Sequence, residues 1–505
     1  MRGRQSIRII VLAVALALPA CGGTPPSPPA TGGQVPARFE AGPCAPTPRP
    51  VPLLAGARCG QLIVPLNRET FDGRTLRLSV AVVPSRTQPP AKEPIVFLTG
   101  GPGQDAVADP PVPADVGINR DRDLIVMGQR GDITSSANLT CPEMDRFIAR
   151  RIGMRYDAPA TGEAYVQAVR ECRDRLARGT DLTAMNSTES TADLIDLRKA
   201  LGIGKWSVFS HSYGTDLALI YLRSDAAAIS AVAFDGVTPP SVAALGWTWA
   251  SARQALDAMV RACVDQPGCA KRYPDLEATF VRLVGEVEAN PVATTVGGTD
   301  VVIDGGSMLA WFVPVATHLP ADFPSVIDEL AHGNPQPMAE QMAGAFAAPA
   351  PVGVFAWGLT LSIWCREWVP FESREDQLAM ANKAFPSFPD SVKAQAPQLP
   401  FLREACDAWN VPRGPASIRD ITVSNLPALV LSGSYDAQTG AVWGDYIAKN
   451  LSRSTVAVAP GEGHGSWAEP CGSTIIASFF ADPNTVDVAC TKDPPPPYAI
   501  HPPRP

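Results

Sequence analysis

The chain has 505 residues, an apolar share of 46% and a formal net charge of −8. This length exceeds that of one small domain and suits a core domain that carries a large insertion. The acidic balance argues against a nucleic-acid-binding protein, because no basic run follows the first ten residues.

The N-terminus has the features of an export signal. Arg2, Arg4 and Arg8 precede an apolar run over 9–18 that is too short to span a bilayer. The next residues, Leu18-Pro-Ala-Cys21-Gly, resemble a bacterial lipoprotein signal in which Cys21 is lipidated. We therefore predict a signal peptide over 1–21, a flexible tether over 22–40 and a membrane anchor on Cys21. The alternative is an ordinary cleaved signal and a secreted or periplasmic protein.

Ten cysteines remain once Cys21 is set aside, an even number in a chain predicted to be exported. This favours disulfides over metal sites, and no C-x2-C pair with nearby histidines suggests zinc. The sequence does not determine the connectivity. Pairing each cysteine with its neighbour along the chain gives Cys44–Cys59, Cys141–Cys172, Cys263–Cys269, Cys365–Cys406 and Cys471–Cys490.

The chain beyond the tether alternates between strand and helix patterns. Strands are predicted at 61–67, 75–83, 94–99, 123–127, 206–209, 231–234, 426–432 and 455–459. Helices are predicted at 163–177, 189–201, 441–451 and 472–480 and directly after the strand at 206–209. This alternation predicts a mostly parallel, doubly wound sheet with ligands beyond the carboxyl ends of its strands.

The pattern changes between about 241 and 415, where helix formers dominate and buried-strand patterns become sparse. We predict a mainly helical cap over 241–415, inserted between two core segments at 41–240 and 416–492. A proline-rich tail over 493–505 closes the chain.

Ser212 lies in Ser210-His-Ser212-Tyr-Gly214, which differs from G-x-S-x-G only at its first position. The motif joins a β-prone run to an apolar-periodic helix. A serine on such a sharp turn presents its hydroxyl, and the helix N-terminus favours the negative charge of an oxyanion. The alternative is a chance turn before a helix.

A serine nucleophile needs a base beside it and a group that orients the base. Among five histidines, His464 alone lies in a glycine-flanked loop after a predicted core strand, whereas His211 is expected to point away from the site. Asp436 ends the preceding strand and is favoured as the acid over Asp235 and Glu367, because it gives the order Ser, Asp, His.

Several segments together resemble the secreted tripeptidyl-aminopeptidase and proline-iminopeptidase-like branch of the α/β-hydrolase superfamily. They are Gly100-Gly-Pro-Gly103, Gln129-Arg-Gly131, Ser212-Tyr-Gly-Thr215, Asp235-Gly236, Cys365-x-Glu367 with Val369-Pro-Phe371, Ser432-Gly-Ser-Tyr-Asp436 and Gly463-His-Gly465. The chain departs from the family pattern at Gly128, Ser210 and Gly440, where Asp, Gly and Pro are usual.

The resemblance implies an α/β-hydrolase fold and a serine peptidase that needs no cofactor. It also implies that the backbone N–H groups of Gly101 and Tyr213 form the oxyanion hole and that Glu367 binds the substrate α-ammonium. An ion pair of Glu367 with Arg366 or another cap arginine is the alternative.

The expected function is an exported exopeptidase that acts on free peptide N-termini. A carboxylesterase or lipase on the same fold is the second hypothesis, and a catalytically silent binding protein is the third. The substrate is accordingly a peptide or a small ester. The sequence leaves open the number of residues released and the oligomeric state.

Overall fold

The computed structural model describes residues 36–108, 117–347, 353–397 and 400–500. The predicted signal peptide, the lipidation of Cys21 and most of the tether lie outside these ranges. Within them, no helix combines the length and apolar character that a membrane crossing requires.

A nine-stranded sheet forms the centre of the protein, with the strand order β1-β2-β3-β5-β4-β6-β7-β10-β11. The first four strands in this order pair antiparallel, and from β5 to β11 all neighbours are parallel. This confirms the predicted α/β-hydrolase fold. The bounds are β1 Arg38–Ala41, β2 Arg58–Pro65, β3 Thr75–Val83, β4 Ile95–Leu98, β5 Leu124–Met127, β6 Trp206–His211, β7 Ile229–Asp235, β10 Ala428–Gly433 and β11 Ser454–Ala459.

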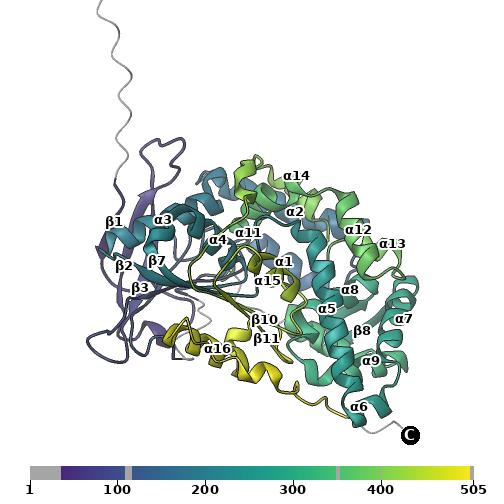
Figure 1. The fold of residues 1–505 in the computed structure, drawn as a ribbon. Coiled ribbons are helices and arrows are strands. Elements are labelled where there is room, and N and C mark those ends of the chain that lie inside the picture. Colours follow the sequence, from purple (N-terminus) through teal and green to yellow (C-terminus); the bar gives the residue numbers. More distant parts are fainter. Residues whose placement is uncertain (1–35, 109–116, 348–352, 398–399, 501–505) are drawn as a thin grey trace, which may run out of the picture. The chain divides into compact units, whose positions relative to one another are not determined.

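Helices cover both faces of this sheet (Figure 1). Alternate residues of β4 show the division, because Val96 packs with the cluster that includes α3 and α4, whereas Phe97 packs with the cluster of α16. The helices of the core are α1 Pro142–Arg151, α2 Pro159–Leu176, α3 Ser187–Ala200, α4 Tyr213–Asp225, α15 Ala441–Ala448 and α16 Pro470–Ala481.

The segment 241–415 is mainly helical, and its hydrophobic residues divide between two clusters. Residues from α5, α7, α8 and α9 form one cluster, which also includes Ile152, Tyr435 and Tyr498 from outside the segment. By contrast, α11 and α14 pack with the central sheet. Its helices are α5 Ala244–Val264, α6 Pro267–Arg272, α7 Leu276–Ala289, α8 Gly305–Trp311, α9 Phe323–Ala331, α10 Gln336–Met342, α11 Trp357–Ile363, α12 Arg374–Ala384, α13 Asp390–Lys393 and α14 Leu402–Trp409. The domain boundaries given above stay a prediction.

Several elements were not individually predicted from the sequence, among them the helix α1 and the short edge strand β1. The antiparallel hairpin of β8 (Val292–Val296) and β9 (Thr299–Ile303) was not predicted either. Gly297 and Gly298 join its strands with φ of 55° and 84°, values that two adjacent glycines adopt readily in a tight hairpin turn.

Arg130 of the Gln-Arg-Gly segment ties the end of β5 to α3. Its buried guanidinium donates two hydrogen bonds of 2.8 Å to Asp193 and two more to the carbonyls of Leu66 and Ala184. A fully buried arginine requires such complete pairing. Arg130 therefore has a structural role, because it joins the loop after β5 to α3 and to two neighbouring segments.

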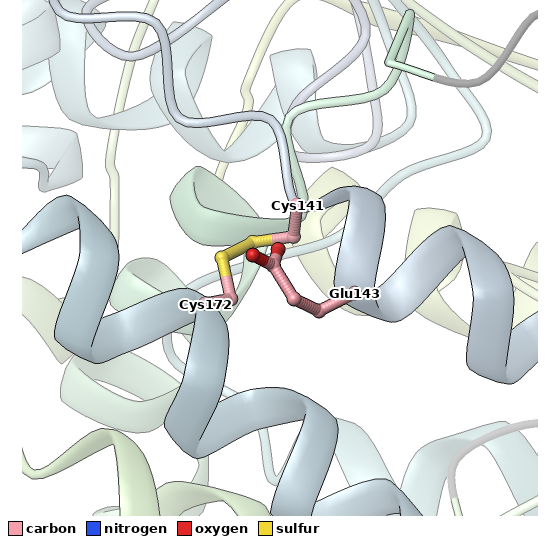
Figure 2. A group of neighbouring side chains, drawn as sticks. All are labelled: Cys141, Glu143 and Cys172. Carbon is pink, nitrogen blue, oxygen red and sulfur yellow. A yellow bond between two sulfur atoms is a disulfide. The ribbon is translucent and has the colours of Figure 1, made fainter.

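All five predicted cysteine pairs form disulfides. Figure 2 shows the bond between Cys141, at the start of α1, and Cys172 of α2, with Glu143 beside it. These three residues group like metal ligands. Both sulfurs are consumed by the disulfide, however, and Glu143 accepts two hydrogen bonds of 2.9 Å from Arg175.

The double variant Cys141→Ala/Cys172→Ala should lower the free energy of unfolding by about 2–4 kcal/mol, because the bond closes a loop in the unfolded chain. Urea unfolding of the purified protein measures this change. As a control, Glu143→Gln removes a partly exposed ion pair and should cost about 1 kcal/mol or less. An alkylatable thiol at either cysteine in the wild type, purified without reductant, would contradict the assignment.

Candidate active site

Ser212 occupies a sharp turn between β6 and α4, as the motif predicted. Its φ of 54° and ψ of −130° lie outside the regions that a residue with a Cβ usually adopts. The turn is held at both ends. The Ser212 N–H donates to the carbonyl of Asp235 at 2.9 Å, and the Ser212 carbonyl accepts from the Thr215 N–H at 2.8 Å.

Two glycines allow the backbone to approach this turn. A Cβ at Gly214 would overlap with the carbonyl oxygen of Leu98 at the end of β4. A Cβ at Gly100 would lie 2.6 Å from the Cβ of Ser212. The glycine-rich loop that begins at Gly100 therefore abuts the candidate nucleophile directly, and Gly101 follows with a φ of 107°.

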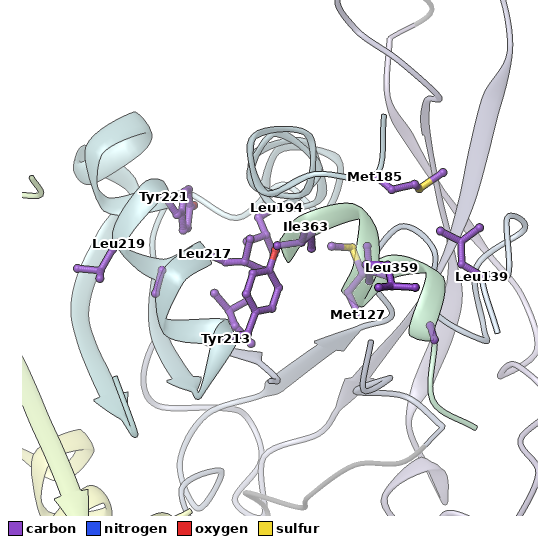
Figure 3. Packing of buried hydrophobic residues seen from close by; sticks show 14 of the residues in the cluster. Met127, Leu139, Met185, Leu194, Tyr213, Leu217, Leu219, Tyr221, Leu359 and Ile363 are labelled. Carbon is purple, nitrogen blue, oxygen red and sulfur yellow. The ribbon is translucent and has the colours of Figure 1, made fainter. Parts of the chain in front are cut away.

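The side chain of Tyr213 points into the hydrophobic core, where Figure 3 shows it among Leu194, Leu217 and Ile363. Its hydroxyl is 2.8 Å from the Ser187 hydroxyl, and burial raises the pKa of Tyr213 well above its usual range. The buried ring anchors the first residue of α4, whose backbone N–H is the predicted oxyanion donor.

His464, Asp436 and Thr439 form a hydrogen-bonded group beyond the ends of β10 and β11. The His464 Nδ1 is 3.0 Å from Asp436 Oδ2 and 2.9 Å from Thr439 Oγ1. Thr439 also donates its hydroxyl to Asp436 Oδ2 at 2.7 Å. The backbone N–H groups of Gln438 and Thr439 hold the other carboxylate oxygen, at 2.9 and 2.8 Å. Asp436 is thus fixed from both sides.

Opposite charge governs the ionisation of this pair. Burial would raise the pKa of Asp436, but the charge of His464 and its hydrogen bonds lower that pKa to about 2. Burial acts to lower the pKa of His464, and the charge of Asp436 outweighs it, so that the pKa of His464 is raised above 6.5. A carboxylate that stays ionised can stabilise an imidazolium formed during a reaction.

His211 does not point away from the site, so that expectation is wrong. Its ring lies 4.8 Å from the His464 ring, centroid to centroid, and its Nδ1 is 3.0 Å from Asp235 Oδ2. Pairing with this carboxylate holds the imidazole beside the site instead of in solvent. Asp235, the rejected candidate for the acid, therefore belongs to a second histidine–carboxylate pair that packs against the first.

Two neighbours hold the loop that carries His464. The Nε2 of His318 is 2.9 Å from the carbonyl oxygen of His464. Glu462 accepts hydrogen bonds from the N–H groups of Cys471 and Gly472 at the start of α16, and burial raises the pKa of Glu462 to about 7. The loop is therefore attached to both the segment 241–415 and the core.

Each departure from the family pattern has a local explanation. The Ser210 hydroxyl donates to the carbonyl of Ala233 at 2.9 Å, which satisfies a polar group that glycine lacks. The Gly440 N–H donates to Ser251 Oγ at 3.1 Å, and a proline has no N–H to donate. At Gly128, a Cβ would overlap with the Thr134 hydroxyl.

Glu367 is buried, with 4% of its surface exposed. Its carboxylate accepts from the backbone N–H of Ser187 at 2.8 Å and from the Ser187 hydroxyl at 2.5 Å, at the N-terminus of α3. Arg366 instead donates to the carbonyl of Pro412. Burial raises the pKa of Glu367 to about 7, although both contacts with Ser187 act to lower it. The role of Glu367 in substrate binding stays a prediction.

The contact of Thr439 with the histidine was not predicted from the sequence. Its position three residues after Asp436 is the signal, because this spacing allows its N–H and hydroxyl to bond back to the preceding carboxylate. The contact of His211 with His464 has no such local signal, since it depends on how two loops meet.

Comparison with known proteins gives partial matches. Residues 396–490 match a family model described as TAP-like protein. A 212-residue segment is 26% identical to Serine protease Hip1 of Mycobacterium tuberculosis and covers 39% of each chain. A 190-residue segment is 24% identical to Putative hydrolase YuaR of Escherichia coli and covers 35% of this chain and 36% of that protein. The match thus spans about two fifths of these relatives or less.

Among solved structures, proline iminopeptidase from Mycobacterium smegmatis is 15% identical, with a TM-score of 0.39 over 84% of this chain and 98% of that one. This likeness bears on neither activity nor substrate.

The pair of Asp436 and His464 predicts a pH dependence. A neutral His464 is needed to accept a proton, so kcat/KM should fall as the pH drops through its raised pKa. Asp436→Asn removes the main charge that raises this pKa, so the acidic limb should move to lower pH while the rate falls about 10³-fold or more. Asp235→Asn should give a smaller shift in the same direction, because the charge of Asp235 also acts on His464.

The measurement is kcat/KM against pH with a fluorogenic ester. Asp445→Asn, at an exposed position on α15, serves as the control and should leave the profile unchanged. An acidic limb that stays in place in Asp436→Asn would show that Asp436 does not set the protonation of His464.

Proposed function

We propose that this chain, which belongs to the TAP-like branch of the α/β-hydrolases, is an exported serine exopeptidase that releases residues or short peptides from free peptide N-termini. The observation that carries the proposal is the pair of His464 and Asp436, packed against the turn that presents Ser212. A nucleophile, a base and an orienting acid are the parts that acyl transfer requires.

The proposed reaction has two halves. The Ser212 oxygen attacks the scissile carbonyl while His464 takes the proton of the Ser212 hydroxyl. His464 then gives this proton to the leaving amine. Backbone N–H groups of Gly101 and Tyr213 would stabilise the oxyanion of the tetrahedral intermediate. Water next attacks the acyl-enzyme with His464 again as base, which releases the acid and restores Ser212. Asp436 stays ionised throughout.

Export is supported by two kinds of observation. Five disulfides in one chain are typical of an oxidising compartment. The sequence around Cys21 adds a site for lipidation, which would anchor the enzyme to a bacterial membrane. The proposal therefore places the enzyme in the cell envelope.

Recognition of a free N-terminus requires an anion, and Glu367 is our candidate. Burial raises its pKa to about 7 against the opposing effects of Ser187 and of the Arg366 charge, so an arriving ammonium would favour the charged form. In the present structure the carboxylate contacts Ser187, so binding of an ammonium would compete with that contact. A carboxylesterase or lipase with the same catalytic group would have no such requirement.

The variant Glu367→Gln tests this assignment. It removes the charge but keeps the side-chain size, so kcat/KM for a peptide amide with a free N-terminus should fall about 30-fold or more, as for loss of a buried charge pair. Hydrolysis of a short acyl ester should continue about as before. The measurement compares both substrates in the wild type, in Glu367→Gln and in Glu404→Gln, a partly exposed control on α14.

An equal loss on the two substrates would show that Glu367 acts only on the fold, through α3. If the wild type hydrolysed esters rapidly but cleaved no peptide, the peptidase assignment would be wrong and the esterase assignment would take its place.

A further inference from the structure

A cavity of about 330 Å³ lies between α1, α2 and the segment that leads into α11. This volume is at the lower end of the range for small-ligand sites. Six aromatic residues account for much of its wall: Phe147, Tyr165, Phe346, Phe355, Trp357 and Trp364. Such a wall favours an apolar group about the size of one or two amino-acid residues.

The cavity adjoins both loops of the candidate active site. Phe355 lies against the glycine loop, where a Cβ at Gly101 would be 3.4 Å from the Phe355 ring. Pro314 lines the other side, and its carbonyl oxygen is 2.8 Å from Nδ1 of His318. The other nitrogen of that ring reaches the carbonyl of His464. A group in this cavity would therefore lie beside the glycine loop that abuts Ser212.

The wall is pre-formed. Asp145 of α1 accepts hydrogen bonds from the Trp357 indole at 3.1 Å and from the N–H of Gly353 at 3.0 Å. The rings of Phe147 and Tyr165 stack with centroids 5.2 Å apart, which joins α1 to α2. These contacts hold the aromatic rings in place before any ligand binds, which lowers the entropic cost of binding.

Arg151, the last residue of α1, is the one charged residue in this wall. Its guanidinium lies 5.6 Å from the Phe346 ring and 5.9 Å from the Tyr156 ring. Within the described ranges it has no carboxylate partner. A cation at a helix C-terminus is favourable, and the five N–H donors of its guanidinium are suited to pair with an anionic acceptor. An arginine on an aromatic wall is suited to a planar anion.

We infer that this cavity binds the apolar C-terminal residue of a short peptide, with Arg151 pairing with the free α-carboxylate. The inference rests on the proposed peptidase function for the identity of the ligand. The aromatic wall takes the side chain, and the guanidinium takes the carboxylate through two parallel hydrogen bonds. An enzyme that holds both ends of its substrate selects short peptides over proteins.

Kinetics supply the first test. The wild type should cleave a tripeptide that ends in phenylalanine with a kcat/KM about 10- to 100-fold above that of the same tripeptide amide, the range for hydrogen bonds to a charged group. Arg151→Gln should abolish this preference, mainly through KM, and Arg151→Lys should restore part of it. Arg150→Gln, the exposed neighbour on α1, is the control and should keep the preference.

Binding supplies a second test that does not depend on peptide cleavage. Calorimetry on Ser212→Ala should show that N-acetylphenylalanine binds at least tenfold more tightly than its amide. The added change Arg151→Gln should remove the difference.

The carboxylate-binding cavity and the peptidase function can be disproved separately. Equal rates for acid and amide, with Arg151→Gln like the wild type, would overturn the inference and leave the exopeptidase in place. If the protein bound N-acetylphenylalanine through Arg151 but cleaved no peptide, the peptidase function would be wrong and the carboxylate-binding cavity would be supported. Equal binding of acid and amide would overturn the pocket itself.

Discussion

The sharp turn at Ser212, where a residue with a Cβ adopts a positive φ, is the constraint on which the rest of the site depends. A residue with positive φ costs about 1–3 kcal/mol and persists only where its surroundings hold it. Here the surroundings are close backbone contacts and a buried ring. Gly214 lies against the end of β4, Gly100 lies against Ser212 itself, and the Tyr213 ring is fixed in the core. The strain is therefore stabilised by the same packing that brings the glycine-rich loop to the serine.

Burial acts to raise the pKa of every carboxyl in this region, and the partner of each one decides the net result. Asp436 faces a histidine that can carry a positive charge, and its pKa falls to about 2. Glu367 and Glu462 face neutral donors, and the pKa of each rises to about 7. Near neutral pH, Asp436 is thus a permanent anion, whereas the other two are balanced between forms. A fixed anion suits an orienting residue, and a carboxyl poised near pH 7 responds to an arriving cation.

Most of the fold follows from local patterns, because buried parallel strands such as β4 and β5 are short apolar runs that end at glycine or polar residues. The Ser212 turn carries its own motif. Contacts between distant loops have no such signal. The contact between the rings of His211 and His464 joins segments more than a hundred residues apart, and so does the hydrogen bonding of Glu367 to Ser187. Likewise, the division of the segment 241–415 between two clusters depends on packing that periodicity does not encode.

Identifying the nucleophile tests the central claim most directly. The intact protein is treated with a fluorophosphonate, digested and analysed by mass spectrometry to locate the adduct. We expect one phosphonylated residue, Ser212, and we expect Ser212→Ala to lose both the label and its turnover by about 10³-fold or more. An adduct on another serine, or turnover that survives in Ser212→Ala, would contradict the account.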